Sequence, residues 1–167
     1  MTRHLKILFA AIVAYWGLVG VIGNLASLGV AYDYVEMVTS MSGVFEEGRP
    51  APPWRTSHPI VVSAGVALIV LGKLGALVFC SVGVVRMIRA RHADDRAFAA
   101  AKSWAVVGCG LAVAMLFGGF VVVGETMYLM WVNPDGEHAA AGAWRYGGFI
   151  ALIMLFIAQA EPDGSET

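Results

Sequence analysis

The sequence predicts an all-α integral membrane protein, an antiparallel bundle of four transmembrane helices with a partly helical outer loop between helices 1 and 2. Composition is the first observation behind this prediction: 59% of the 167 residues are hydrophobic and 14% are charged, whereas soluble domains average about 25% charged residues. The second is that four apolar runs approach or exceed the ~20 residues with which a helix crosses ~30 Å of hydrocarbon. These runs and their connections predict a single domain.

The first span is expected at residues 7–30. A secretory signal peptide would also begin with a basic head, but the apolar run here is about 24 residues long and that of a signal peptide is typically about 7–15. No clear cleavage site follows it. Small residues recur at Gly17, Gly20 and Gly23, and small residues on one face let another helix backbone approach closely. We therefore expect a retained helix that packs against a neighbour.

The polar connection at residues 31–58 is the longest in the chain. Its apolar positions between Val35 and Phe45 have the spacing of a short amphipathic helix, lying on the membrane surface or capping the bundle. Gly48 and the prolines that follow it break any helix before the second span. We therefore expect an outer loop that is helical in part.

The other spans are expected at residues 59–88, 103–132 and 139–160. Pro59 suits the first turn of a helix, where its missing N–H costs nothing. The third span ends in the stretch Gly124–Trp131, and Pro134-Asp135-Gly136 after it is typical of a turn. Arg145 interrupts the start of the fourth span. The polar, acidic tail at 161–167 is expected to be disordered.

Lysine and arginine residues beside the spans predict the orientation. Seven lie on one side of the membrane if the spans alternate: Arg3, Lys6, Arg86, Arg89, Arg91, Arg96 and Lys102. Three lie on the other side: Arg49, Arg55 and Arg145. Because cytoplasmic loops carry the excess of basic residues, we expect a multi-pass protein of the inner (plasma) membrane with both termini in the cytoplasm.

Among the polar residues inside the expected spans, three are candidates for a site: Asn24, Lys73 and Glu125. A charge at the centre of a membrane helix costs ~2.5–3.5 kcal/mol on insertion scales. Lys73 and Glu125 could form a structural ion pair or polar lock, with Asn24 at a depth comparable to that of Glu125. They could instead form a proton or ion relay or contact a substrate, or Lys73 could face a water-filled crevice or a partner subunit.

Several large side chains are placed to anchor the protein at the membrane interface: Tyr128, Met130, Trp131, Trp54 and Arg145. Tryptophan and tyrosine are enriched there because their rings are amphipathic, and an arginine can extend its head towards water. At a span boundary these residue types more often form a belt or packing surface than a cofactor site. We expect the same here.

No pattern in the sequence predicts a metal, a cofactor or a catalytic residue. His58 and His138 lie on the outer side near carboxylates, but their spacing is not a known zinc pattern. No histidine lies within an expected span, which excludes a b-type haem held between two membrane histidines. The glycines fit no phosphate-binding motif, and no hydrolase or metalloprotease motif is present. Cys80 and Cys109 lie in apolar runs near the same basic loop, where a buried, reduced pair is expected.

Short motifs along almost the whole chain carry a resemblance. They are Gly124-Glu125 followed by Tyr128, Met130 and Trp131; Asn24; Val35, Val38, Ser40 and Met41; Trp54-Arg55; and Ala143-Trp144-Arg145. In this order they resemble the predicted small integral membrane proteins of domain-of-unknown-function family 2165. The chain departs from that pattern at Met37, Ser42, Lys73 and the looser Pro134-Asp135-Gly136. The resemblance implies the topology, and it implies no activity because the family carries none that is established.

Three classes of function follow from these features. The first is a non-enzymatic accessory or scaffold subunit of an inner-membrane assembly, in contact with the lipid bilayer and with a membrane-protein partner or further copies of itself. The alternative is a small ion- or proton-coupled transporter that uses Lys73 and Glu125. The third, an enzyme using Glu125, His58, His138 and Asp135, is supported by no spacing. The net charge of −1 and the lack of a basic face give no reason to expect a nucleic-acid partner.

Overall fold

The structure of the protein is a computed structural model that describes residues 2–45 and 50–161. All regular structure in these residues is helical, and four helices are long and apolar enough to cross a membrane: Thr2–Ala26, Pro59–Arg89, Asp95–Met127 and Pro134–Ala158. Large apolar side chains stand exposed along all four, among them Tyr15, Leu68, Phe117 and Phe149. The prediction of an all-α membrane protein with four spans is confirmed.

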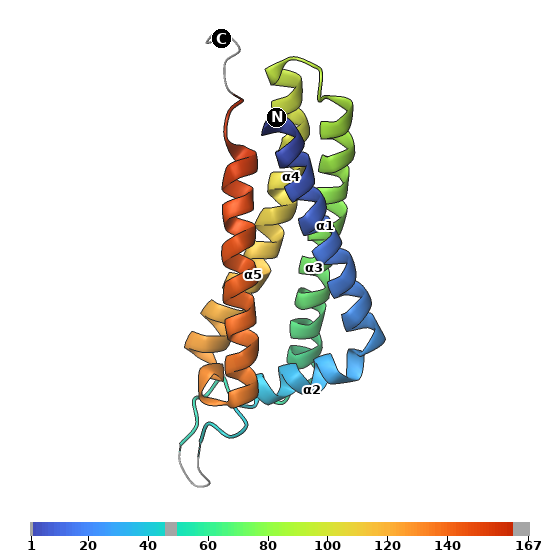
Figure 1. Ribbon diagram of the computed structural model, residues 1–167. Coiled ribbons are helices and arrows are strands. Elements are labelled where there is room, and N and C mark those ends of the chain that lie inside the picture. Colours follow the sequence, from blue (N-terminus) through green and yellow to red (C-terminus); the bar gives the residue numbers. More distant parts are fainter. Residues whose placement is uncertain (1, 46–49, 162–167) are drawn as a thin grey trace.

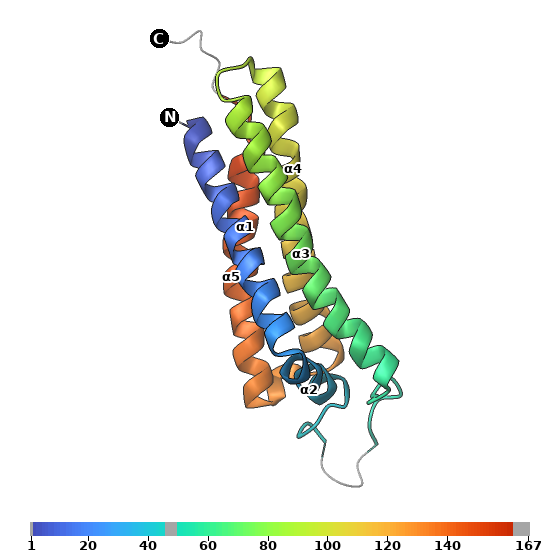
Figure 2. The ribbon, with the colours of Figure 1, turned by 90° about the vertical axis from the view of Figure 1, so that its right-hand side faces the viewer.

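The order of the helices brings the start of α1 and the end of α5 to the same end of the bundle. α1 (Thr2–Ala26) leads into α2 (Leu28–Thr39), and α3 (Pro59–Arg89) leads through a short turn into α4 (Asp95–Val113). α4 continues as the π-helix η1 (Ala114–Met127), which is followed by the short η2 (Met130–Val132) and by α5 (Pro134–Ala158). The start of α1, the end of α5 and the turn between α3 and α4 lie at one end of the bundle, which we call the terminal end (Figures 1 and 2). α2 lies at the other end, the α2 end.

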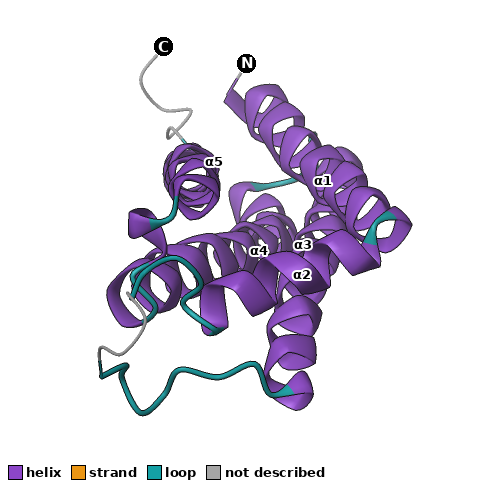
Figure 3. Ribbon diagram, turned by 90° about the horizontal axis from the view of Figure 1, so that it is seen from below, coloured by secondary structure: helices purple, strands orange, loops and turns teal. Residues whose placement is uncertain are grey.

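α2 is the helical part of the outer loop, but it begins and ends earlier than the sequence suggested. The chain leaves α1 at Ser27, whose φ of −133° and ψ of 47° are not helical, and α2 then crosses the end of the bundle (Figure 3). The expected helix from Val35 to Phe45 is not formed as one unit. Met41 and Gly43 adopt φ values of 51° and 75°, and such left-handed residues end a helix.

The third and fourth spans also begin earlier than expected, because side chains cap them. The Asp94 carboxylate accepts a hydrogen bond from the Ala97 N–H at 2.7 Å and thereby caps α4. Asn133 caps α5 by accepting from the Asp135 N–H at 2.9 Å. Pro134-Asp135-Gly136 is therefore the first turn of α5, and the prediction of a loop turn there was wrong. An N-cap followed by proline is a helix start signal.

α3 is the centre of the packing. Its contacts with α1 and with α4 are the two most extensive between helices of the bundle. Glycines make this possible. A Cβ on Gly17 would lie 2.8 Å from the backbone nitrogen of Leu77, and a Cβ on Gly108 would lie 2.7 Å from that of Cys80. The small-residue face of α1 thus packs against α3 at Gly17 and Gly20, whereas Gly23 has no neighbour within 4 Å.

We expect Gly108→Ala to lower the stability of the folded protein by about 1–3 kcal/mol, because the added methyl overpacks the contact between α4 and α3. Gly148→Ala is the matched control, since a Cβ at Gly148 meets nothing within 4 Å. Alanine also has a higher helix propensity than glycine, so Gly148→Ala should not lower the stability. Thermal unfolding in detergent measures both variants, and equal melting temperatures for the two would contradict the close contact.

Candidate functional site

Lys73 on α3 and Asn24 on α1 form a polar pair inside the membrane-spanning region. The Lys73 ammonium donates to Asn24 Oδ1 at 3.3 Å. The carbon chain of Lys73 lies across Gly20, where an added Cβ would stand 2.7 Å from its Cδ. The amide nitrogen of Asn24 is buried and has no hydrogen-bond partner within the described part of the chain. The pair is therefore only half satisfied.

Lys73 of this pair lines a lateral crevice between α1 and α5. The crevice has a volume of about 490 Å³, and its lining includes Tyr15, Trp16 and Gly20 from α1, Gly142, Ala143 and Tyr146 from α5, and Lys73. Trp16 and Tyr146 approach each other at its edge, with ring centroids 6.1 Å apart. Lys73 is thus a half-buried cation beside an opening on the side of the bundle.

Glu125 does not join this pair. It is half-buried near the end of η1, and no ion pair links it to Lys73, both residues lying in the described ranges. The cause is the packing of α1 on α3. Because Gly17 and Gly20 bring α1 against Lys73, the lysine side chain extends along α1 towards Asn24. Of the three polar residues singled out in the sequence, the structure brings two together.

The stretch Gly124–Trp131 forms part of the core at the α2 end. Leu129 adopts a left-handed φ of 51°, which turns the chain back on η1. The Met130 side chain then packs on Gly124 and the Met130 backbone carbonyl on Gly136, and neither glycine has room for a Cβ. Met130 is 3% exposed and Trp131 is 56% exposed. Met130 and the buried Tyr128 are therefore core residues, whereas Trp131 has the exposure of an interface anchor.

The outer loop is fastened to this end by side chains that bond to backbone carbonyls. The Trp54 indole donates to the Met127 carbonyl at 2.9 Å, and the Arg55 guanidinium donates to the Ser40 carbonyl at 2.6 Å. Trp54 thus connects the loop to the end of η1, and its ring remains partly exposed. Arg145 is exposed on α5 and donates to the Ala141 carbonyl one turn earlier at 3.2 Å.

The outer histidines have local roles. His58 caps α3 by accepting from the Ile60 N–H at 3.3 Å, and a His138 ring nitrogen lies 2.7 Å from the Pro134 carbonyl oxygen. Within residues 2–45 and 50–161, no three or more histidine, cysteine, aspartate or glutamate side chains are grouped to hold a metal ion. Cys80 and Cys109 are buried free thiols whose sulfurs lie 3.9 Å apart.

The motif segments noted in the sequence thus meet mostly at the α2 end and in the contact between α1 and α3. The family model described as predicted small integral membrane protein (DUF2165) matches residues 2–160. The chain belongs to this family. No curated protein and no solved structure is significantly similar to it. The role of the site in this DUF2165 protein is therefore inferred from its own residues.

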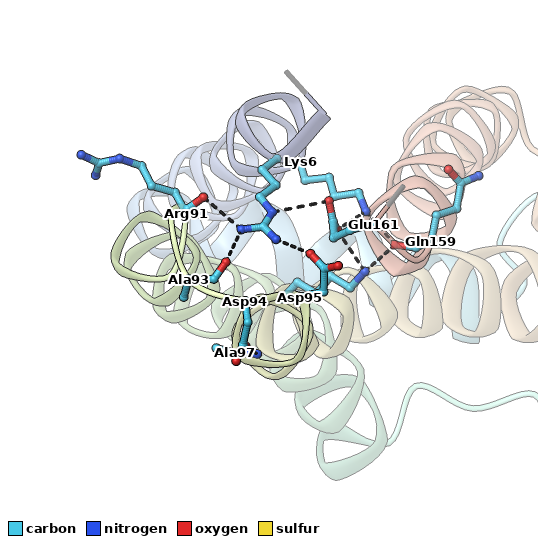
Figure 4. A network of polar contacts seen from close by, with 10 residues as sticks. Lys6, Arg91, Ala93, Asp94, Asp95, Ala97, Gln159 and Glu161 are labelled. Atoms are coloured by element: carbon cyan, nitrogen blue, oxygen red, sulfur yellow. Dashed lines mark hydrogen bonds and ion pairs between the residues drawn. The ribbon is translucent and has the colours of Figure 1, made fainter. Parts of the chain in front are cut away.

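The terminal end of this DUF2165 protein carries a cluster of charges that we call the terminal ion cluster: Arg3, Lys6, Asp95, Lys102 and Glu161 (Figure 4). The Glu161 carboxylate lies 2.6 Å from the Lys6 ammonium and 3.4 Å from that of Lys102. Both ammonium groups also donate to the Gln159 carbonyl. One carboxylate therefore joins α1, α4 and the chain after α5.

Sequence reasoning missed this cluster. It treated Lys6 and Lys102 as cytoplasmic surface charges and assigned Glu161 to a disordered tail, of which residues 162–167 lie outside the described residues. The structure buries Lys6 completely. Helical periodicity could have predicted the burial of Lys6, because Lys6 shares one face of α1 with the buried Ala10, Val13 and Gly17.

The pKa of Glu161 reflects its partners. Burial alone would raise the pKa of this carboxyl group, but the hydrogen bond and charge of Lys6 and the charge of Lys102 outweigh burial and lower it below the ordinary value. A carboxyl group with a lowered folded-state pKa stabilises the fold fully above its unfolded-state pKa, which is about 4.3 for glutamate. The stabilisation is lost as the pH falls through the folded-state pKa.

We expect Glu161→Gln to destabilise the protein by about 3–5 kcal/mol at pH 7, because it leaves two buried ammonium groups without an anion. The difference in melting temperature between wild type and variant should shrink as the pH falls below about 4, where the wild-type carboxylate itself becomes protonated. Differential scanning fluorimetry in detergent from pH 7 to pH 3 measures this.

Asp95→Asn is the matched control. Asp95 pairs with Arg3, but its side chain is 59% exposed whereas that of Glu161 is 4% exposed. Exposed pairs contribute about 0–1 kcal/mol, so the control should stay close to wild type. A loss for Glu161→Gln no larger than for Asp95→Asn would contradict a structural role for the buried cluster.

Proposed function

We propose that this protein is a non-enzymatic accessory subunit of an inner-membrane assembly, and that a transmembrane helix of its partner packs into the lateral crevice. The observation that carries the proposal is that Lys73, which lines that crevice, belongs to a half-satisfied pair with Asn24. The ammonium of Lys73 has a neutral amide oxygen as its acceptor, and the amide N–H₂ of Asn24 has no acceptor among the described residues.

The chemistry of the pair defines its partner. Lys73 lines the crevice and bonds to Asn24, so the pair holds two donors, one of them charged, and a carboxylate offers two acceptor oxygens and the opposite charge. Charged residues inside a membrane pair with one another or face a bundle interior, because an unpaired charge in hydrocarbon is costly. A partner helix that carries an aspartate or glutamate at this depth would satisfy both donors.

The shape of the crevice supports a helix as occupant. Gly20, Gly142 and Ala143 are among its lining residues, and small residues allow a close approach of two helix backbones. Tyr15 and Tyr146 are exposed at its sides and provide aromatic surface for packing. We attribute no catalysis to this site, because an amine and an amide alone do not form the nucleophile and base of a covalent mechanism.

The alternative is an ion- or proton-coupled transporter that uses Lys73 and Glu125. A relay between them would require the two groups to be linked, whereas Lys73 bonds to Asn24 and not to Glu125. The accessory role is therefore our conclusion. Proton- or ion-dependent flux in liposomes containing the purified protein, abolished by Glu125→Gln, would favour transport instead.

We also propose that both termini face the cytoplasm, because the excess of basic residues lies at the terminal end. Cysteines introduced singly at Ser57 and Ala93, which are exposed and lie before the start and after the end of the spanning helix α3, test this with a membrane-impermeant maleimide. We expect labelling of Ser57→Cys in right-side-out vesicles and of Ala93→Cys in inverted vesicles. The reverse pattern would overturn the orientation. The native thiols are buried and provide a low background.

The docking proposal predicts a crosslink with a defined chemistry. A photo-crosslinking amino acid at Gly142, in the crevice, should capture a membrane helix that contains an acidic residue. The same amino acid at Leu152, an exposed position on α5 outside the crevice, is the control and should not capture it. Mass spectrometry of crosslinked peptides from native membranes identifies the helix.

Lys73→Met should weaken the association about 100-fold, corresponding to the ~3 kcal/mol or more lost when one partner of a buried pair is removed. Methionine keeps an unbranched chain over Gly20, so folding should be retained. Binding should recover when the partner's carboxylate is also replaced by a neutral residue of similar shape, because no buried charge is then left without its partner. Purification of a homogeneous homo-oligomer with no other protein would contradict the accessory role.

A further inference from the structure

A second cavity of this bundle lies between α2, α3 and η1, at the α2 end. Its volume is about 460 Å³, within the ~300–1,000 Å³ of small-molecule sites. Its lining is mostly aliphatic and aromatic, with Phe120 and Tyr128 among the aromatic residues and the hydroxyl groups of Tyr34 and Thr39 as polar groups on α2. Its lining residues carry no charged side chain.

The η1 wall of this α2 cavity leaves space open at Gly119. Glycines line both sides, Gly65 and Gly72 on α3 and Gly119 and Gly124 on η1, but Gly65, Gly72 and Gly124 are closely packed against Val35, Met115 and Met130. The η1 wall is a π-helix over Ala114–Met127, a wide and rare conformation that is frequent at functional sites. A Cβ on Gly119 would meet nothing within 4 Å, so the space beside this wall is not filled by the chain.

One polar atom in the lining is unsatisfied. The Tyr34 hydroxyl oxygen is buried and makes no hydrogen bond within the described residues. Burial, and to a lesser extent the negative charge of Asp135, raise the pKa of Tyr34 to about 12, so the group stays a protonated donor at neutral pH. A buried hydroxyl without a partner costs about 1–3 kcal/mol, and a ligand with an acceptor atom would remove that cost.

The opening of the cavity indicates where a ligand comes from. Leu68 and Leu71 line it and are also among the most exposed apolar residues of α3. On a membrane-spanning helix such exposed leucines face lipid. The cavity is therefore accessible from the bilayer, and its uncharged lining excludes an ionised head group because a buried charge needs a partner.

We propose that the α2 cavity binds a neutral lipid-soluble molecule with a carbonyl oxygen on a flat ring, the chemical class of the quinones, with the Tyr34 hydroxyl as donor to that oxygen. The ring packs beside Phe120 and Tyr128, and the alkyl tail leaves between Leu68 and Leu71 into the bilayer. The polar groups of the two sites differ, Tyr34 and Thr39 in this cavity and Lys73 in the docking crevice, although Phe120 lines both.

Decylubiquinone is the probe for this proposal, and decylbenzene, which has no carbonyl oxygen, is its control. The full-length protein in phosphatidylcholine nanodiscs is titrated with each at increasing mole fraction, and its melting temperature is followed. A ligand that binds the folded state raises this temperature. We expect decylubiquinone to raise it with a saturable midpoint and decylbenzene to raise it less. Equal shifts for the two compounds would overturn the proposal.

Tyr34→Phe removes the donor and keeps the ring. We expect the midpoint for decylubiquinone to rise about tenfold, the loss of one hydrogen bond to a neutral acceptor. The ligand-free variant should melt no lower than wild type, because the hydroxyl makes no hydrogen bond there. An unchanged midpoint would refute the role of the hydroxyl. A lower melting temperature without ligand would assign the hydroxyl a structural role and would equally refute it.

Neighbouring glycines provide a second, matched pair. Gly119 lines the cavity and Gly118 does not, and an added Cβ meets nothing within 4 Å at either. Gly119→Leu should abolish the shift caused by decylubiquinone, whereas Gly118→Leu should keep it. A full shift in Gly119→Leu would place the ligand elsewhere and overturn the site.

Discussion

The close approach of α1 to α3 at Gly17 is the contact on which the other features of this bundle depend. Because the two backbones touch there, the Lys73 side chain has to run along α1, and it reaches Asn24. The same contact holds α1 beside α3, while α5 packs chiefly on α4 and η1. Near the terminal end Phe9 and Phe156 still meet, with ring centroids 5.6 Å apart, and Glu161 joins both halves. Towards the α2 end α1 and α5 part, and the lateral crevice is the result.

The sequence predicted features that depend on one helix at a time. Span positions followed from hydropathy, and the packing face of α1 followed from Gly17 and Gly20. Features that depend on the rotation of one helix against another could not be predicted. The partner of Lys73 depends on which side of α3 meets α1, so Glu125 was as plausible as Asn24. Lys6 was counted as a surface charge because counting basic residues for orientation ignores the face on which each one lies.

The stretch Gly124–Trp131 shows a different limit. Its composition suggested membrane-interface anchors, and Trp131 is exposed in that way, but Met130 is buried between Gly124 and Gly136. That arrangement requires the left-handed turn at Leu129 and the π-helix before it. Leucine has no preference for a positive φ, and π-helices are too rare for a local pattern to indicate one. Here tertiary packing decides the backbone, so the purpose of Gly124 becomes visible only in three dimensions.

Two polar atoms that the described chain leaves unsatisfied point in the same direction. The Asn24 amide nitrogen and the Tyr34 hydroxyl are buried. Asn24 bonds to Lys73, which lines the crevice, and Tyr34 lines the α2 cavity. The hydrocarbon of a bilayer has no hydrogen-bonding groups, so lipid cannot satisfy the Asn24 amide on α1. The terminal ion cluster shows that this small bundle satisfies buried charges where its own elements meet. Where they part, towards the α2 end, both groups lack a partner among the described residues, and the two proposed sites differ in charge: an acidic residue on a helix suits one and a neutral acceptor suits the other.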